Sequence, residues 1–313
     1  SRLDLHPTTG VISVKKAGGP NWDREQVSRH YLTVEARDDL GVGNRNTVQL
    51  IINIEDVNDN APIFTQSRYE ARLLENRLDF ENPLKVEARD ADLNGTKNSE
   101  IEYSVFGELG YNFTMDPASG VIKPVGPLDF ELLEGSSSEN IRQLHLTVRA
   151  RDWGNPSLFS DVPLHIYVQD VNDHAPVFEY SVYNKSVPEN IPGGTSILQV
   201  RAKDFDGSSP NNRIVYRIQN GAADKFIIGA ESGVISVARG ASLDPDLTQP
   251  RTLHYSLNVV ALDGAPGENQ LQAAVTVNVS ILDVNNKSPV FYEPDTITVR
   301  ENTAVRHSNL SLV

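Results

Sequence analysis

The chain has 313 residues, and its 42 acidic residues outnumber 28 basic ones to give a net charge of −14. Such a surface repels phosphates, which argues against a nucleic-acid partner, and the absence of cysteine excludes disulfides and thiolate metal sites. No run approaches the ~18 consecutive apolar residues that a membrane span needs.

Alternating hydrophobic residues predict short β-strands along the chain. In chain order the hydrophobic positions of the clearest strands are Val48, Leu50, Ile52 and Ile54; Leu144, Leu146, Val148 and Ala150; Leu164, Ile166 and Val168; and Val275, Val277, Val279 and Ile281. A period of two buries one face of each strand. No segment keeps a helical period, so the pattern predicts an all-β fold of antiparallel sandwiches.

Several short strings recur with a period of about 113 residues. They are D-V-N-D-N-A-P from Asp56, D-V-N-D-H-A-P from Asp170 and D-V-N-N-K-S-P from Asp283; E-N at Glu75, Glu189 and Glu301; the glycine of S/T-G-V-I at Gly10, Gly120 and Gly233; the aspartate of A-x-D at Asp38, Asp152 and Asp263; and D-x-D at Asp90/Asp92 and Asp204/Asp206. Independent markers with one shared period predict a tandem array.

The phase of the period divides the chain into four parts. Residues 1–59 hold the later half of one repeat, residues 60–173 and 174–286 are two complete repeats, and residues 287–313 open a fourth. We therefore expect the chain to be a piece of a longer protein, about whose leader and anchor these residues say nothing. Asp38 and Glu301 would belong to junctions beyond this chain.

Acidic residues gather where the predicted strands end. The strand that ends at Ala36 runs into Asp38, and the strand that ends at Ile54 runs into Asp56 and Asp59. Two carboxylates about 5 Å apart repel by about 3 kcal/mol at an effective dielectric near 20, so such a cluster needs a positive occupant. Without cysteine, hard cations that prefer oxygen ligands remain.

These strings, together with D-R-E at residues 23–25, resemble the extracellular cadherin repeat along the whole chain. The resemblance implies Greek-key, immunoglobulin-like β-sandwich repeats in a linear rod, with three calcium ions at each junction that stiffen it. It implies calcium-dependent cell–cell adhesion, no enzymatic activity, an extracellular location on a plasma-membrane protein, and another cadherin ectodomain as homophilic or heterophilic partner. A receptor ectodomain that binds a soluble ligand or toxin, or a mechanical tether between membranes, are the alternatives.

The resemblance implies calcium ligands from side chains or main-chain oxygens at three junctions. For the first junction they are Asp23, Glu25, Asp56, Val57, Asn58, Asp59, Asn60, Asp90, Asp92, Asn98 and Asp152. For the second they are Glu75, Asp129, Glu131, Asp170, Val171, Asn172, Asp173, His174, Asp204, Asp206, Asn211 and Asp263. For the third they are Glu189, Asp244, Asp246 and Asp283. A glycosidase interpretation of Asp129 and Glu131 is disfavoured, because the period already explains both.

The third junction is expected to bind calcium weakly. Asn286 stands where the other linkers carry Asp59 and Asp173, and an amide offers only a neutral acceptor oxygen. Pro245 stiffens the loop between Asp244 and Asp246, and Lys287 adds a positive charge. Retention of one ion with water ligands is the alternative.

Glycosylation sequons support an extracellular location. They lie at Asn94, Asn112, Asn184, Asn278 and Asn309. A sixth, at Asn286, has Pro289 just beyond it, which argues against its occupancy.

Overall fold

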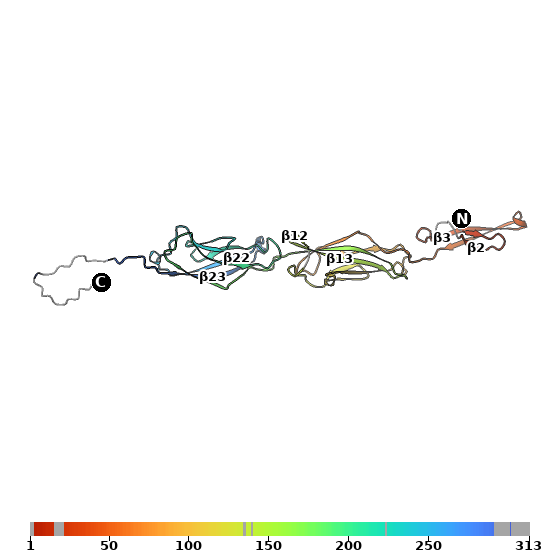
Figure 1. Cartoon of the computed structure of the whole chain (residues 1–313). Coiled ribbons are helices and arrows are strands. Elements are labelled where there is room, and N and C mark those ends of the chain that lie inside the picture. Colours follow the sequence, from red (N-terminus) through yellow and green to blue (C-terminus); the bar gives the residue numbers. More distant parts are fainter. Residues whose placement is uncertain are drawn as a thin grey trace. The chain divides into compact units, whose positions relative to one another are not determined.

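The computed structural model describes residues 3–15, 22–133, 136–138, 140–222, 224–290 and 301 (Figure 1). The chain divides into two compact units. The first comprises residues 1–177, 203–214 and 262–272, and the second comprises residues 178–202, 215–261 and 273–313. The first two predicted junctions lie wholly within the first unit, and the described part of the third lies within the second. The predicted fourth repeat falls almost entirely outside the described residues.

The first segment forms two small antiparallel sheets. Its elements are β1 (Leu3–Leu5), β2 (Ile12–Val14), β3 (Arg29–Arg37), the short 3-10 turn η1 (Asp39–Gly41) and β4 (Arg45–Asn53). β1 pairs with β2, and β3 pairs with β4. The strand predicted around Val48 is confirmed. Leu50, Ile52 and Ile54 are half-buried between exposed neighbours, as the alternation predicts, but Val48 is 62% exposed. No hydrophobic side chain described between residues 3 and 59 is buried, so β4 has no packed partner layer in this part.

The next segment forms a complete β-sandwich. Its elements are β5 (Ile63–Phe64), β6 (Tyr69–Leu74), β7 (Leu84–Lys85), β8 (Ala88–Arg89), β9 (Ile101–Gly107), η2 (Gly110–Asn112), β10 (Phe113–Met115), β11 (Val121–Pro124), β12 (Ser136–Ser138), β13 (Ile141–Asp152) and β14 (Phe159–Gln169). One sheet has the order β12-β13-β14-β6, with β9 also paired to β13, and the facing strands have the order β10-β11-β7. The predicted hydrophobic positions of β13 and β14 are buried in one core.

The following segment repeats this plan within the second unit and the loops beside it. Its elements are β15 (Val177–Phe178), β16 (Val182–Pro188), β17 (Ser196–Gln199), β18 (Ala202–Lys203), β19 (Val215–Asn220), β20 (Phe226–Ile228), β21 (Val234–Val237), η3 (Pro245–Leu247), β22 (His254–Leu262), η4 (Gly267–Asn269) and β23 (Gln272–Leu282). The sheets run β16-β23-β22-β19 and β17-β21-β20. The predicted face of β23, from Val275 to Ile281, is buried. The all-β sandwich prediction is therefore confirmed.

One strand pair in each sandwich is parallel, which the alternation did not predict. β6 pairs in parallel with β14, and β16 pairs in parallel with β23. The first and last long strands of a repeat therefore run in the same direction. The chain enters a repeat at one end and leaves it at the other, as a tandem array requires.

Two glycines of the S/T-G-V-I strings make tight turns against the segment that joins two short strands. Gly120 and Gly233 have φ angles of +70° and +65°, a region that side chains rarely adopt. A Cβ atom at Gly120 would lie 2.4 Å from the Val86 carbonyl oxygen, and one at Gly233 would lie 2.3 Å from that of Val200. Backbone geometry thus accounts for this repeated string. Among the described residues, no helix is both long and apolar enough to cross a membrane.

Candidate metal centres

The parallel pairing of β6 with β14 builds the second junction. Its register places Leu74 opposite Gln169, so that Glu75 and Asp170 leave the sheet side by side. Glu75 is 1% exposed, and its carboxylate accepts hydrogen bonds from the main-chain N–H groups of Phe130 at 2.8 Å and Val171 at 2.6 Å. A buried carboxylate is thereby held at the end of the sandwich with its charge only partly compensated.

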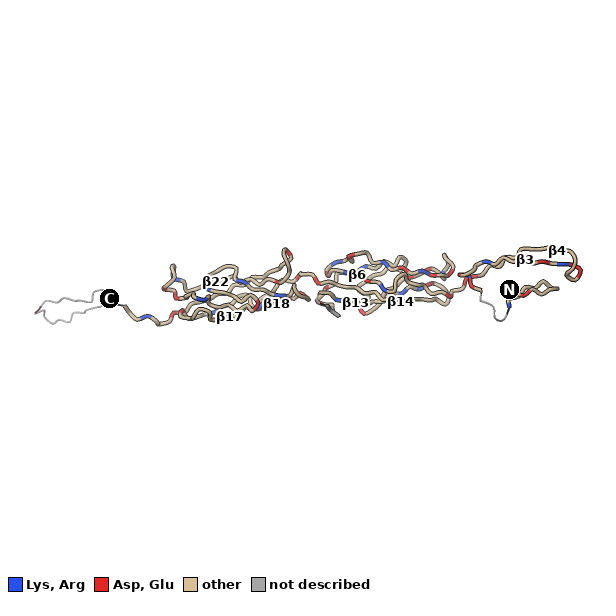
Figure 2. The backbone as a smooth tube through the Cα atoms, turned by 90° about the horizontal axis from the view of Figure 1, so that it is seen from above, with Lys and Arg blue, Asp and Glu red and all other residues tan. Residues whose placement is uncertain are grey.

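Two loops of the following repeat complete the second junction. Asp204 and Asp206 follow β18, and the Asp206 N–H donates to Asp204 Oδ1 at 2.9 Å. Asp263 follows β22, and the Asn172 amide donates to its Oδ2 at 2.8 Å. Figure 2 marks the Asp and Glu residues along the backbone, in the sandwiches and in the segments that connect them. The predicted carboxylates therefore meet from three separate stretches of the chain.

Buried oxygen atoms of the second junction lack hydrogen-bond donors. They are Asp170 Oδ1, Asn172 Oδ1, Asp204 Oδ2 and Asp206 Oδ2. Ligand atoms of Glu131, Asp170 and Asp206 lie within 4.8 Å of one another, as do those of Glu75, Asp129 and Glu131 and those of Glu131, Asp173 and His174. Buried polar atoms are almost always paired, so this donor set of carboxylate and amide oxygens fits a hard divalent cation.

The electrostatics of the second junction show the same uncompensated charge. Burial, and then the neighbouring Glu75, raise the pKa of Glu131 to about 7. Burial, and then Asp204, raise the pKa of Asp206 to about 6. A carboxylate held in a poorly solvated cluster of like charge favours its protonated form unless a cation is present.

The first junction has a similar set of unpaired oxygens. Asn58 Oδ1, Asp90 Oδ2 and Asp92 Oδ2 are buried without a donor. The Asn58 amide donates to Asp152 Oδ2 at 3.1 Å, as Asn172 does to its counterpart Asp263. Ligand atoms of Glu25, Asp56 and Asp92 lie within 4.8 Å of one another.

Arg24, the middle residue of the D-R-E string, enters this first cluster, which the sequence did not indicate. Its Nε lies 2.5 Å from Asp56 Oδ1, and its Nη2 pairs with Glu25. Burial raises the pKa of Asp56, but donors from Asn98, Leu93 and Arg24 outweigh it, so that the net shift is downward. Arg24 thus neutralises part of the cluster.

Several predicted ligands have local partners that their pattern did not reveal. Asp23 accepts from the Gln26 main chain at 3.0 Å and from its amide at 2.7 Å. The side-chain amides of Asn98 and Asn211, expected to offer carbonyl oxygens, donate to Asp56 and Asp170 at 2.8 and 3.0 Å. Ser208, a residue missed by the sequence patterns, is buried and donates its hydroxyl to Asp170.

The described part of the third junction differs in kind. The register of β16 with β23 places Glu189 beside Asp283, as in the second junction, and the Glu189 N–H donates to Leu282 O at 3.0 Å. The Lys287 ammonium, however, lies 3.1 Å from Asp244 Oδ2 and 2.6 Å from Asp246 Oδ2. The hydrogen bond from Lys287 holds the pKa of Asp246 below its usual value. Among the described residues here, no buried carboxylate oxygen is left without a donor.

Five of the six sequons fall on described residues, and one of these, Asn286, lies in the third linker. Asn94 is exposed, Asn112 ends η2, and Asn184 and Asn278 lie opposite each other on β16 and β23. The Asn278 amide donates to Asn184 Oδ1 at 3.0 Å. Asn309 lies outside the described residues.

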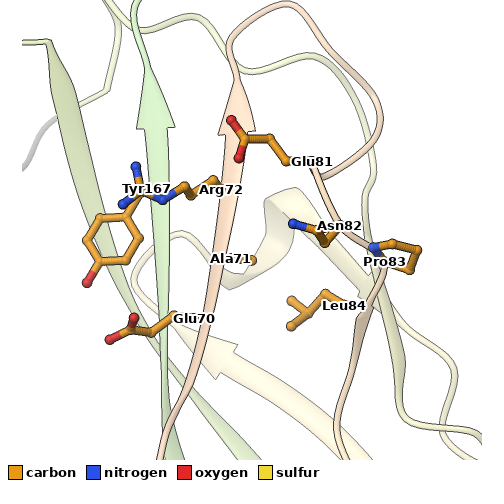
Figure 3. Close-up of a pocket in the computed structure, with 8 residues that line it drawn as sticks. All are labelled: Glu70, Ala71, Arg72, Glu81, Asn82, Pro83, Leu84 and Tyr167. Carbon is orange, nitrogen blue, oxygen red and sulfur yellow. The ribbon is translucent and has the colours of Figure 1, made fainter.

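A shallow pocket lies apart from the junctions, on the first sandwich (Figure 3). It has a volume of about 270 Å³ and lies between β6 and the segment 81–84. The Arg72 guanidinium lies 5.7 Å from the centre of the Tyr167 ring at one side of it. Its lining includes none of the predicted metal ligands.

The family whose profile is described as Cadherin domain matches residues 69–169 and 183–282. The chain belongs to the cadherin family. The two matched stretches coincide with the two β-sandwiches, and their ends fall just before the carboxylates of the second and third junctions. The family resemblance seen in the sequence is therefore confirmed.

Known cadherins align with nearly all of the chain. Rat Cadherin-23 is 35% identical over 296 residues, which cover 93% of this chain and 8% of the relative. Human Cadherin EGF LAG seven-pass G-type receptor 2 is 36% identical over 311 residues, which cover 97% of this chain and 10% of the relative. The chain thus spans about a tenth of the length of the curated relatives it matches.

Solved structures show the same repeat architecture. Mouse Cadherin-23 EC22-24 has a TM-score of 0.69 and 27% identity, and the alignment covers 90% of this chain and 83% of that one. Protocadherin gammaB7 EC3-6, solved as a cis-dimer, has a TM-score of 0.68 and 26% identity, over 89% of this chain and 66% of that one. This chain therefore consists of cadherin ectodomain repeats.

Proposed function

We propose that this chain is part of an extracellular adhesion rod whose first two junctions are stiffened by calcium. The observation that carries the proposal is the set of buried carboxylate and amide oxygens that have no hydrogen-bond donor in both junctions. When bound, calcium would supply positive charge and bridge oxygens from different repeats. The repeats are taken to be residues 60–173 and 174–286, joined by linkers that begin at Asp56 and Asp170.

In the proposed second junction, the calcium ligands come from the linker and from both adjoining repeats. Glu75, Asp129 and Glu131 would offer carboxylates from the preceding repeat, and Asp204, Asp206 and Asp263 from the following one. Main-chain N–H groups already satisfy part of Glu75, so its position does not depend on a bound ion. In the first junction, Glu25, Asp56 and Asp92 would play the corresponding part.

Cell–cell adhesion by pairing with another cadherin ectodomain is the proposed role of the rod. The cis-dimer of Protocadherin gammaB7 EC3-6, a similar structure, supports pairing between cadherin ectodomains. The similarity to a protein named as a seven-pass G-type receptor favours, as a second candidate, a place in a membrane receptor. In both cases the parent protein would be anchored in the plasma membrane, with glycans on exposed sequons such as Asn94.

Calcium titration with a matched pair of variants tests this function. Asp206→Asn removes one buried carboxylate whose Oδ2 has no donor, whereas Asp224→Asn makes the same change at a side chain that is 76% exposed. We expect Asp206→Asn to weaken binding at the second junction by at least about tenfold and Asp224→Asn to leave it unchanged, as measured by isothermal titration calorimetry. No calcium uptake by the wild-type chain at millimolar calcium would refute the proposal.

A further inference from the structure

The third junction already holds a positive charge between its two loop carboxylates. The Lys287 ammonium contacts Asp244 and Asp246 together, at 3.1 and 2.6 Å. Arg251 approaches Asp246 Oδ1 from the other side, at 3.3 Å. Two cationic side chains therefore face these two carboxylates, so the charges of Asp244 and Asp246 are balanced without an added ion.

The linker also supplies a neutral donor where the other linkers supply a carboxylate. The Asn286 amide donates to Glu189 Oε1 at 2.9 Å. Asp173 holds the corresponding place in the second junction, where it accepts a hydrogen bond from Asn76. The buried Glu189 thus has a neutral amide as its hydrogen-bond donor. A linker with this amide in place of a carboxylate does not fit a calcium ion that bridges two repeats.

We propose that the Lys287 ammonium is the resident counter-ion of the third junction, so that this linker is held to the η3 loop without calcium. The inference rests on the proposed function in one respect: it contrasts the third junction with two junctions that are proposed to bind calcium. A lysine fixed to the chain is always present at its site, whereas calcium must be taken up from solution.

Calcium sites of extracellular modules bind weakly, so a competing side-chain cation such as Lys287 matters. Extracellular modules bind calcium with dissociation constants of roughly 10⁻⁴–10⁻³ M. Displacement of Lys287 would weaken such binding further, at a site that already lacks the linker carboxylate that Asp173 supplies in the second junction.

Arg24 in the first junction provides an internal comparison. It pairs with Asp56 and Glu25, yet Asp90 Oδ2 and Asp92 Oδ2 remain buried without a donor. A built-in cation therefore does not by itself remove the need for a metal. The third junction differs because its described carboxylates are paired or exposed.

Hydrogen exchange of the whole chain, followed by mass spectrometry in calcium and in EDTA, tests the inference at each linker. We expect calcium to slow exchange at least about fivefold in residues 56–62 and 170–176, and less than about twofold in residues 242–250 and 283–290. Lys287→Gln should speed exchange in residues 283–290 at least about threefold in EDTA. Lys287→Arg should retain the wild-type rate.

Lys185→Gln, at an exposed lysine of β16, is the charge-matched control and should leave exchange at the linker unchanged. Calcium protection of residues 283–290 in the wild type equal to that of the other linkers would overturn the inference. An unchanged exchange rate for Lys287→Gln in EDTA would also overturn it. If no linker responds to calcium while Lys287→Gln still speeds exchange, the proposed calcium function fails and the role of Lys287 stands.

Discussion

The second and third junctions share one backbone arrangement, but the charges of their side chains are balanced differently. In each, a parallel strand pair places a buried glutamate, Glu75 or Glu189, beside the first aspartate of the linker. The second junction then gathers further carboxylates whose oxygens lack donors. The third offers Asn286 and Lys287 as donors instead. The need for a cation is therefore set by a few side chains of the linker and not by the sandwich that holds them.

The largest expected effect is on stability: truncation of a buried carboxylate at the second junction should lower the unfolding free energy more than truncation of an exposed one at the third. Asp263 is fully buried and accepts from the Leu271 N–H at 2.7 Å and from the Ala265 N–H at 2.9 Å. We expect Asp263→Ala to lower the unfolding free energy by about 2–4 kcal/mol, because buried donors lose their acceptor. Asp283→Ala, at the exposed first aspartate of the third linker, should change it by less than about 0.5 kcal/mol. Urea denaturation in EDTA measures both, and equal losses would contradict the contrast.

Within the second junction, loss of Asp173 should weaken calcium binding more than loss of Asp263, although Asp263 has the larger expected effect on stability. The donors to Asp173 are the side chains of Asn76 and His174, which can turn away, whereas main-chain N–H groups of Ala265 and Leu271 hold the oxygens of Asp263 in place. Asp173→Ala should weaken calcium binding at least about tenfold, and Asp263→Ala should weaken it less. Titration calorimetry on the two variants decides the order. A larger loss for Asp263→Ala would show that the proposed ligand roles are wrong.

The two junctions should also differ in their dependence on pH. Glu131 has a folded pKa of about 7, above its ordinary 4.5, so its contribution to the stability of the calcium-free protein is full below about pH 4.5 and is lost as pH rises through 7. Calcium needs the ionised carboxylate, so affinity at the second junction should rise about tenfold from pH 6 to pH 8.

At the third junction the sign is opposite and the window lies lower. Lys287 depresses the pKa of Asp246 below its ordinary 3.8, so stability from this pair is present above about pH 4 and is lost in more acidic solution. Calorimetric titrations at pH 6, 7 and 8 check the prediction for the second junction. Calcium affinity that does not change over this range would contradict the protonation of Glu131.

Salt should produce the smallest effect. Lys287 and Asp246 have side chains that are 51% and 46% exposed, and ion pairs in contact with solvent contribute little to stability. Raising sodium chloride from 0.05 to 0.5 M should speed exchange in residues 283–290 by less than about threefold. The same change in EDTA should slow exchange in residues 170–176, because screening reduces carboxylate repulsion there. Faster exchange in both linkers would contradict the assignment of attraction to one and repulsion to the other.

The sequence predicted well those features that depend on local period. Alternation identified the buried faces of β13, β14 and β23, and the repeat spacing identified the carboxylates that meet at the second junction. Both depend on neighbours along the chain and on the phase of a repeat. The predicted face of β4 is only half-buried, because alternation specifies which side chains share a face but not whether another layer covers them.

Contacts between distant side chains were not predictable in this way. Arg24 reaches Asp56, which lies 32 positions further along the chain, and Ser208 reaches Asp170. Neither residue carries a spacing that signals its partner, because their meeting depends on loop conformation. Lys287 was recognised as a nearby charge, but its simultaneous contact with Asp244 and Asp246 depends on the fold of η3.

The amides of Asn58 and Asn172 give these junctions a sensitivity to chemical ageing. Each donates its two N–H bonds to fixed acceptors: Asn58 to Asp152 and the Pro156 carbonyl, and Asn172 to Asp263 and the Asn269 carbonyl. Deamidation would exchange that donor for a carboxylate and place it about 3 Å from an oxygen of the same charge. Hydrolysis of this one amide, which consumes water and releases ammonia, would then turn an attraction that holds the linker to its repeat into a repulsion. A long-lived extracellular protein of this design would therefore loosen with time at its linkers while its β-sandwiches stayed intact.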